Sequence, residues 1–106
     1  QIQKVKAYVH ANLQQDISRE EVAKKLFINP DYLDRLFKKK MDISVSKYIM
    51  QERMSYAKIL LVETELSISE IANGFGYSNL SNFSTMFKKT ESMSPIDYRK
   101  TNRKEI

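Results

Sequence analysis

The sequence predicts an all-α protein of seven helices, with two helix-turn-helix subdomains joined by a long linker helix. Three observations predict this architecture. Only two glycines and two prolines occur among the 106 residues, whereas residues that favour helices are common. Apolar residues recur at intervals of three and four along most of the chain. One pattern of helix caps, apolar positions and basic residues also occurs twice.

The first predicted subdomain (1–43) begins with a helix whose apolar residues are Ile2, Val5, Tyr8 and Val9. Ser18 and Glu21 have the spacing of a capping box, in which each residue satisfies a backbone amide of the other, and they open the second helix. Phe27 and Ile28 lie in the turn that follows this helix. We expect both side chains to fill the core between the second and third helices.

The third helix begins at Asn29, which can cap the first free amides, and Pro30 suits the first helical position. Its predicted buried face is Leu33, Leu36 and Phe37, and the opposite face carries Asp31, Asp34, Arg35 and Lys38. Two helices joined by a tight turn form a helix-turn-helix, whose second helix can enter a DNA major groove. A solvated helical hairpin with a basic end is the alternative for this stretch alone.

The linker helix is predicted over residues 44–63, with Ser44 as its cap. Its apolar stripe comprises Val45, Tyr48, Ile49, Tyr56, Ala57, Leu60 and Leu61. A helix of this size is a rod of roughly 28 Å, at about 1.5 Å per residue. We therefore interpret it as a spacer between the two subdomains.

The second predicted subdomain (64–106) repeats the pattern of the first. Ser67 and Glu70 form a second capping box, and Gly76 lies where the bend can use a positive φ. Asn79 or Ser78 caps the next helix, whose buried face carries Phe83 and Phe87; Ser94 and Pro95 open a short last helix.

The two copies align at an offset of 49 residues before the turn and 50 after it, so the second turn has one extra residue. Tyr48 and Tyr98 share one position in this alignment, and we expect them to pack in the core. Successive major grooves on one DNA face lie about 34 Å apart, which is close to the length of the spacer. The recognition helices, predicted at residues 30–40 and 80–89, can therefore occupy adjacent major grooves.

The net charge of +5 favours an anionic partner. Residues 1–50 carry ten of the basic and six of the acidic side chains, a net of +4, so any electrostatic footprint should be stronger on the first half. There is no cysteine and no glycine-rich phosphate loop, and the single histidine, His10, is expected to be an exposed bystander. We therefore predict neither an enzyme nor a site for a cofactor or metal.

No apolar run approaches the roughly 20 residues that span a membrane, and no signal peptide is visible. A soluble protein of the cytoplasm, without a membrane partner, is the simplest interpretation. The chain begins at Gln1 rather than methionine, which suggests a piece of a longer protein.

The chain resembles the DNA-binding domain of AraC-type (AraC/XylS) bacterial transcription regulators. The resemblance is carried by Tyr32 to Lys38, Tyr48-Ile49 with Arg53 and Ala57, Leu60-Leu61, Ile68 to Ala72, Gly76-Tyr77, Phe83-Ser84 with Phe87-Lys88, Ser94-Pro95 and Tyr98-Arg99. The Gly-Tyr pair is closest to the response-regulator branch, in which the domain works in a two-component system. Asp42 and Ser92 depart from the family, since a glycine usually follows each recognition helix.

The resemblance implies sequence-specific binding of double-stranded promoter or operator DNA. Arg35 stands where the family carries a base-contacting arginine, which suits a bidentate contact with guanine. The other candidates for base contacts are Asp31, Asp34, Leu80, Ser81, Ser84 and Thr85. Arg35 has an alternative role in an ion pair with Asp31, four residues earlier. The two aspartates can accept from cytosine amino groups, orient Arg35, or be simply solvated.

Candidates for phosphate contacts are basic side chains and polar residues at or near helix N-termini: Ser18, Asn29, Tyr32, Lys38, Lys39, Ser44, Ser67, Asn79, Asn82, Lys88 and Ser94. The lysines can equally complement the C-terminal ends of their helices, and the two roles are compatible. Thr85 stands where many family members have arginine, so we expect the first subdomain to supply more of the affinity.

The resemblance also implies partners beyond DNA. RNA polymerase is one candidate, and an N-terminal sensor or receiver domain fused to this fragment is another. The alternative function is a basic helical protein-interaction module with only non-specific affinity for nucleic acid. That interpretation leaves the duplicated helix-turn-helix spacing unexplained.

Overall fold

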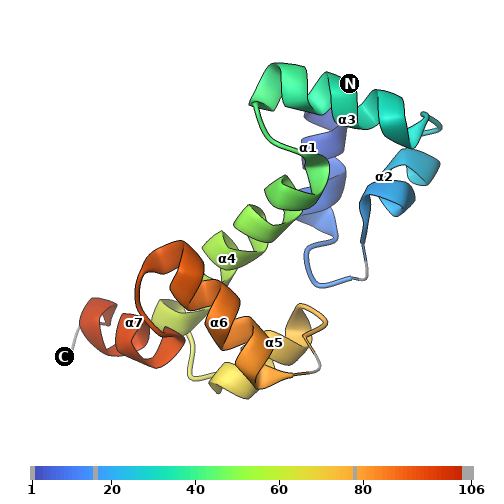
Figure 1. The fold of residues 1–106 in the computed structure, drawn as a ribbon. Helices are drawn as coiled ribbons and strands as arrows, with labels where there is room; N and C mark the ends of the chain where they lie inside the picture. The colour runs from blue at the N-terminus through green and yellow to red at the C-terminus, as the bar shows by residue number, and fades with distance from the viewer. Residues whose placement is uncertain (1, 16, 78, 104–106) are drawn as a thin grey trace. The chain divides into compact units, whose positions relative to one another are not determined.

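The computed structural model describes residues 2–15, 17–77 and 79–103. Over these residues it contains seven α-helices and no strands, which confirms the all-α prediction (Figure 1). The helices are α1 (Ile2–Ala11), α2 (Arg19–Lys25), α3 (Pro30–Met41), α4 (Val45–Glu63), α5 (Ile68–Gly74), α6 (Leu80–Glu91) and α7 (Pro95–Asn102). Among the described residues, no helix is long and apolar enough to cross a membrane.

The chain divides into two compact units, Gln1–Glu52 and Arg53–Ile106, so that α4 begins in the first and ends in the second. In the first unit α1 contacts both α2 and α3. The core of this unit comprises Val5, Val9, Leu13, Ile17, Val22, Ala23, Leu33, Phe37, Val45, Tyr48 and Ile49. The rings of Phe37 and Tyr48 meet edge to face with centroids 5.1 Å apart, which confirms the packing role of Tyr48.

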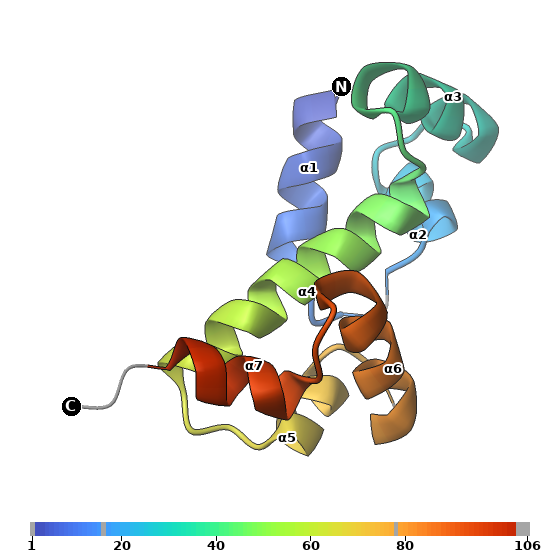
Figure 2. The ribbon, with the colours of Figure 1, turned by 60° about the vertical axis from the view of Figure 1, so that its left-hand side comes forward.

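In the second unit α5, α6 and α7 gather around the C-terminal part of α4 (Figure 2). Its core comprises Met54, Ala57, Leu60, Leu61, Ile71, Ala72, Phe75, Phe83 and Phe87. Tyr98 packs edge to face against Phe87 with centroids 5.6 Å apart, as expected for the counterpart of Tyr48. The guanidinium of Arg99 donates to the carbonyls of Leu61 and Leu66 at 2.8 and 2.6 Å, so it satisfies a backbone group that the end of α4 leaves unpaired.

The predicted caps explain where the helices begin. The Asn29 side chain accepts from the amides of Asp31 and Tyr32 at 2.8 and 3.1 Å. Ser67 and Glu70 form both halves of a capping box. Asn79 caps α6, whereas the alternative, Ser78, lies outside the described residues. Hydroxyl caps that accept from the third amide of the helix occur at Ser18, Ser44 and Ser94. The predicted capping box at Ser18 is therefore only half formed, because among the described contacts the Glu21 side chain does not accept from the Ser18 amide.

The two turns have the same pattern of backbone hydrogen bonds. The amide of Ile28 donates to the Ala23 carbonyl, and the amide of Tyr77 donates to the Ala72 carbonyl, both at 3.0 Å. The left-handed position in the second turn is Gly76, with φ of 81°, as predicted. Its counterpart in the first turn, 49 residues earlier, is Phe27 with φ of 59°.

The prediction that Phe27 fills the core is wrong, because this residue is 95% exposed. The buried aromatic residue of the second turn, Phe75, aligns with Leu26 and not with Phe27. Phe27 lies one position after Leu26, at the left-handed residue of the turn, and its side chain points to solvent. Ile28 is half-buried, so the expectation for the turn holds only in part.

Both recognition-helix candidates end in the left-handed conformation without a glycine. The caps are Asp42 with φ of 65° and Ser92 with φ of 67°, and each amide donates to a lysine carbonyl at 2.8 Å. A residue with a side chain adopts this conformation at a cost of about 1–2 kcal/mol. Asp42 and Ser92 therefore adopt the left-handed conformation that glycine would favour, although neither is the glycine that is usual in the family.

His10 is not the bystander that the sequence suggested. Its side chain is 55% exposed, yet Nε2 lies 2.9 Å from Oε1 of Glu52 and 3.1 Å from the hydroxyl of Tyr48. These contacts link α1 to the beginning of α4 within the first unit.

Candidate nucleic-acid interface

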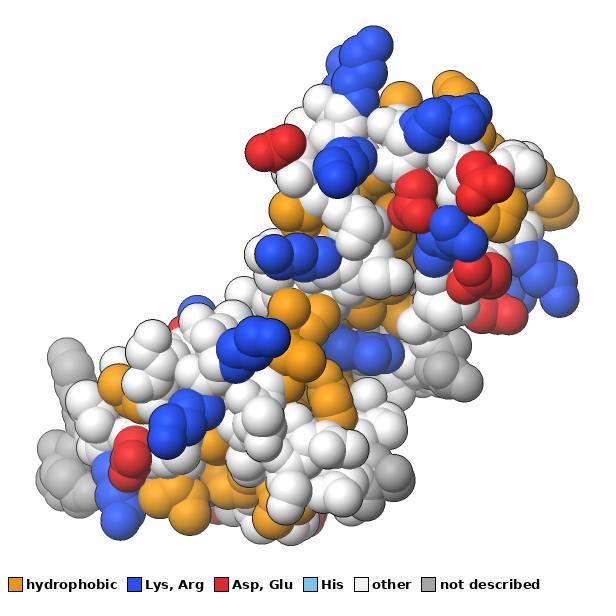
Figure 3. Space-filling view, viewed as in Figure 1, with side chains coloured by type: hydrophobic (Ala, Val, Ile, Leu, Met, Phe, Trp, Pro, Cys, Tyr) orange, Lys and Arg blue, Asp and Glu red, His pale blue; other side chains and the backbone are white. Residues whose placement is uncertain are grey.

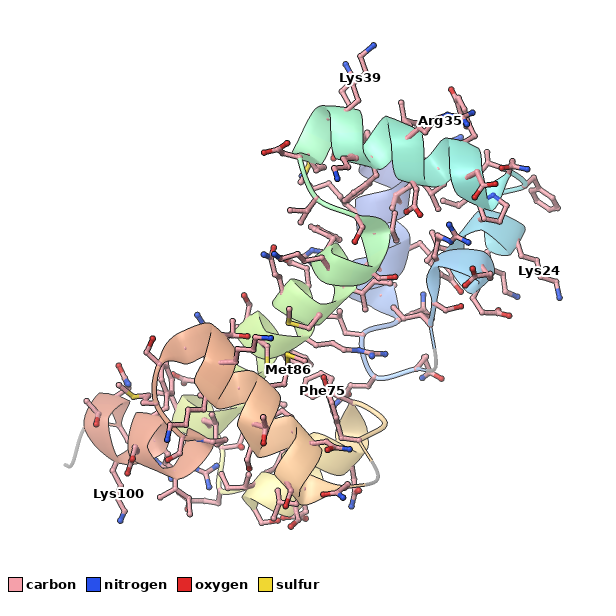
Figure 4. All side chains as sticks on the ribbon, in the orientation of Figure 1. Lys24, Arg35, Lys39, Phe75, Met86 and Lys100 are labelled. Atoms are coloured by element: carbon pink, nitrogen blue, oxygen red, sulfur yellow. The ribbon has the colours of Figure 1, made fainter. Side chains whose placement is uncertain are left out.

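The exposed face of α3 carries the predicted contact residues of the first unit. Arg35, Lys38 and Lys39 are exposed, as are Asp31 and Tyr32 near the start of the helix. The side chains of Arg35 and Lys39 point away from the rest of the unit (Figure 4). Because Leu33 and Phe37 are completely buried, the helix is anchored along its opposite face.

The exposed face of α6 has the same layout with different chemistry. Asn82, Thr85 and Lys88 are exposed, as are Leu80 and Ser81 at the start of the helix, and Ser84 is half-buried. Positions i, i+3 and i+4 of a helix share one face. The structure therefore brings Ser81, Ser84 and Thr85 together, as it brings Asp31, Asp34 and Arg35 together on α3.

The succession of buried, half-buried and exposed residues is the same over 31–41 as over 81–91. Both helices have twelve residues, an asparagine cap and two lysines in the last turn at matching positions. The side chains that point outward therefore occupy equivalent positions on equivalent supports.

The carboxylates of α3 are paired with Arg19, the first residue of α2. Nη1 of Arg19 donates to Oδ2 of Asp34 at 2.9 Å and to Oδ1 of Asp31 at 3.4 Å. Nη2 and Nε of the same guanidinium donate to Oε2 of Glu20 at 2.8 and 3.0 Å. Acidic and basic side chains accordingly intermix over α2 and the start of α3 (Figure 3).

Arg19 changes the interpretation of the two aspartates. Among the described residues Arg35 has no ion pair, so neither its pairing with Asp31 nor its orientation by the aspartates is present. Sequence reasoning missed Arg19, because its partners lie 12 and 15 residues further along the chain. The fold of the hairpin alone brings them together.

The hydrogen bond with Asp34 and then the one with Glu20 raise the pKa of Arg19 further above its usual value. The hydrogen bond from Arg19 is also the main cause that lowers the pKa of Glu20. These groups are therefore charged at neutral pH.

The candidates for phosphate contacts fall into two groups. The side-chain oxygens of Ser18, Asn29, Ser44, Ser67, Asn79 and Ser94 accept from amides of their own helices. These residues mark helix N-termini, where amides and the helix dipole favour anions. The second group, Tyr32, Lys38, Lys39, Asn82 and Lys88, is exposed on α3 and α6. Within the described residues no cluster of three or more His, Cys, Asp or Glu side chains is placed to hold a metal.

A family profile described as "Helix-turn-helix domain" matches residues 22–101. The chain is 38% identical over 95 residues to the "Uncharacterized HTH-type transcriptional regulator YtdP" of Bacillus subtilis, which covers 90% of this chain and 12% of that protein. It is 35% identical over 99 residues to the "Msm operon regulatory protein" of Streptococcus mutans, covering 93% of this chain and 36% of that protein. The chain thus spans about a third or less of these curated relatives.

Among solved structures, the C-terminal domain of AraT, a response regulator from Geobacillus stearothermophilus, superimposes with a TM-score of 0.92. It is 37% identical in sequence, and the match covers 98% of this chain and 87% of that one.

Proposed function

Because the chain belongs to the AraC-type family of helix-turn-helix DNA-binding domains, we propose that it binds double-stranded DNA sequence-specifically, with α3 and α6 as recognition helices in adjacent major grooves. One observation supports this function above the others. Two twelve-residue helices present the same outward positions on the same buried supports. A helix with its N-terminal residues exposed is the element that enters a major groove in helix-turn-helix proteins.

Base contacts come from the outward positions of the two helices. Arg35 is exposed and without an ion pair among the described residues, so its guanidinium is available for N7 and O6 of a guanine. Asp31 is exposed enough to accept from a cytosine amino group. On α6, Ser81, Ser84 and Thr85 offer hydroxyls, and Leu80 offers an apolar contact for a thymine methyl.

Phosphate contacts hold the domain in register on the duplex. Lys38, Lys39 and Lys88 are exposed in the last turns of their helices, where each can bind a phosphate and complement the helix dipole. The remaining candidates are polar groups at helix starts and on the recognition helices: Ser18, Asn29, Tyr32, Ser44, Ser67, Asn79, Asn82 and Ser94.

The domain is proposed to act as the output part of a bacterial transcription regulator in the cytoplasm. Its likeness to the C-terminal domain of a response regulator supports a fused N-terminal receiver or sensor domain. RNA polymerase is the partner that such a regulator would recruit or exclude at a promoter. The relatives are named as regulators and not as enzymes, which supports a role without catalysis.

The alternative, a basic module that binds an acidic protein, is not favoured. It gives no reason for two hairpins with matching caps, matching burial and different outward residues. It also predicts equal affinity for all duplexes.

Selection from a randomised duplex pool, followed by fluorescence anisotropy of the selected site, tests the function. We expect two half-sites about 10 base pairs apart and a steep loss of affinity with salt. Arg35→Ala should relax the preference in one half-site by about 1–3 kcal/mol of discrimination. Lys100→Ala is the matched control, because it removes one positive charge from an exposed position on α7 (Figure 4). Equal, weak binding to all duplexes would overturn the function.

A further inference from the structure

We propose that Arg19 is a specificity-determining residue of the first unit, which keeps Asp34 from contacting DNA and leaves Asp31 and Arg35 as the base-contacting residues of α3. The proposal rests on the proposed function and assigns a role to a residue outside the recognition helix. Arg19 acts through the carboxylate that it binds and is therefore a positioning residue.

The outward face of α3 contains an electrostatic conflict. Asp31 and Asp34 lie on the helical face that carries Arg35, and a carboxylate close to DNA phosphates is repelled. An unpaired aspartate on such a face weakens binding to every sequence unless it accepts from a base. The structure resolves this conflict differently for the two aspartates.

Asp34 is turned away from solvent. Its side chain is only 31% exposed, its Oδ1 is buried, and its Oδ2 accepts from Arg19 at 2.9 Å. Hydrogen bonds between charged groups are about twice as strong as neutral ones, so this contact fixes the orientation of the carboxylate. With one oxygen buried and the other bound, Asp34 has no oxygen directed at a base.

Asp31 is held weakly by the same guanidinium. Its side chain is 77% exposed, and its Oδ1 lies 3.4 Å from Nη1, the nitrogen that already donates to Asp34. Glu20 occupies the other two nitrogens, Nη2 and Nε. Asp31 can therefore turn toward a base, whereas Asp34 can do so only if it loses Arg19.

The second unit supplies an internal comparison. Arg19 aligns with Ile68 at the offset of 49, and Asp34 aligns with Ser84 at the offset of 50. All four side chains are half-buried. The charged pair of the first hairpin thus aligns with two uncharged, half-buried side chains in the second, so Ile68 and Ser84 supply uncharged replacements taken from equivalent positions.

The test compares Arg19→Ile, Asp34→Ser and the double variant with the wild type. Each protein is titrated by anisotropy against the selected duplex and against duplexes with single base changes in each half-site, and its unfolding is measured in urea. Arg19→Ile releases an unpaired carboxylate, and we expect about tenfold weaker binding with an altered preference in the half-site of α3 alone. The double variant should bind within about threefold of the wild type, because the released carboxylate is gone.

The two variants that lack Asp34 keep the test decisive even if Arg19→Ile fails to fold. Since Asp34 makes no base contact in the proposal, the wild-type preference should be kept by the double variant, which also lacks the guanidinium that could hold Asp31 once Asp34 is gone. A preference that changes in both variants lacking Asp34 would show that Asp34 contacts a base and would overturn the proposal, whereas a change in Asp34→Ser alone would show that Arg19 positions Asp31. The proposal is also overturned if Arg19→Ile and the double variant bind equally weakly while both remain folded.

Failure of the proposed function appears in a different measurement. If the wild type selects no bipartite site, the function fails before any variant is compared. If the wild type selects such a site and both variants that lack Asp34 change it, only the role of Arg19 fails.

Discussion

The hairpin of α2 and α3 and the hairpin of α5 and α6 have the same backbone plan and matching buried apolar positions, but they differ in the further contacts between their elements. Asparagine caps, left-handed C-caps and the order of buried residues agree between them. In the first hairpin, Arg19 joins α2 to α3 through Asp34. In the second, Tyr77 from the turn meets Phe83 of α6 edge to face with centroids 5.5 Å apart.

This difference shows which positions determine the fold. The apolar positions and caps recur because each one buries a side chain or satisfies a backbone group. Most outward positions of α3 and α6 neither bury a side chain nor satisfy a backbone group, so charges in one copy can be hydroxyls in the other. We infer that the duplicated scaffold allows two different surfaces for DNA recognition.

The largest expected effect tests the equivalence of the two cores. Phe37→Ala and Phe87→Ala should each lower the free energy of unfolding by about 3–5 kcal/mol, because both rings are completely buried. Urea denaturation followed by circular dichroism measures the loss. Ile59→Ala is the control, since that side chain is 56% exposed. A small loss at one phenylalanine and a large one at the other would break the comparison.

A smaller effect is expected at the left-handed residues of the two turns. Gly76→Ala should destabilise the second unit by about 1 kcal/mol, since a side chain at φ of 81° is strained although no atom lies within 4 Å of the added carbon. Phe27→Gly should stabilise the first unit by roughly 0.5–1 kcal/mol. The substitution removes the strain of a side chain at positive φ, and this gain exceeds the entropy that the more flexible glycine loses on folding. Thermal unfolding of each variant, compared with the wild type, measures the change in stability. Two shifts of the same sign would contradict the equivalence of the turns.

The smallest effect is a pH dependence of the second hairpin. The amide of Ser67, and then its hydroxyl, lower the pKa of Glu70 below its ordinary value of 4.5. A depressed pKa in the folded state adds stability above the unfolded value, and this stability is lost as pH falls through the folded value. Glu70→Gln should therefore flatten the pH dependence of unfolding below about 4.5. Glu21→Gln at the matching position of the first hairpin is the control, and an equal flattening there would contradict the assignment.

The sequence predicts all seven helices and most of their starts, because caps and apolar spacing are local signals. Asn29, Ser67 and Gly76 have the roles that their neighbours in the chain predict. The same local signals recover both recognition helices within a residue or two of their observed ends.

Most failures concern contacts between elements or the direction of a side chain in a turn. The direction of the Phe27 side chain does not follow from apolar periodicity, because periodicity ends at the turn and a shift of one residue there reverses the direction of a side chain. Arg19 and His10 were missed because their partners lie on other helices. The position of the outward face of α3 therefore follows from the sequence, whereas the ion pairs on that face are visible only in the folded hairpin.

A transplant of the outward residues tests the central claim most directly. Ser81→Asp, Ser84→Asp and Thr85→Arg copy the α3 surface onto α6, and Ile68→Arg supplies the partner of the new carboxylates. Selection from a random duplex pool should then yield two half-sites with the same sequence preference, in a protein that keeps its helical circular dichroism. Thr85→Arg alone should already introduce a guanine preference in the second half-site. An unchanged second half-site in folded variants would contradict the account of two equivalent scaffolds with different recognition surfaces.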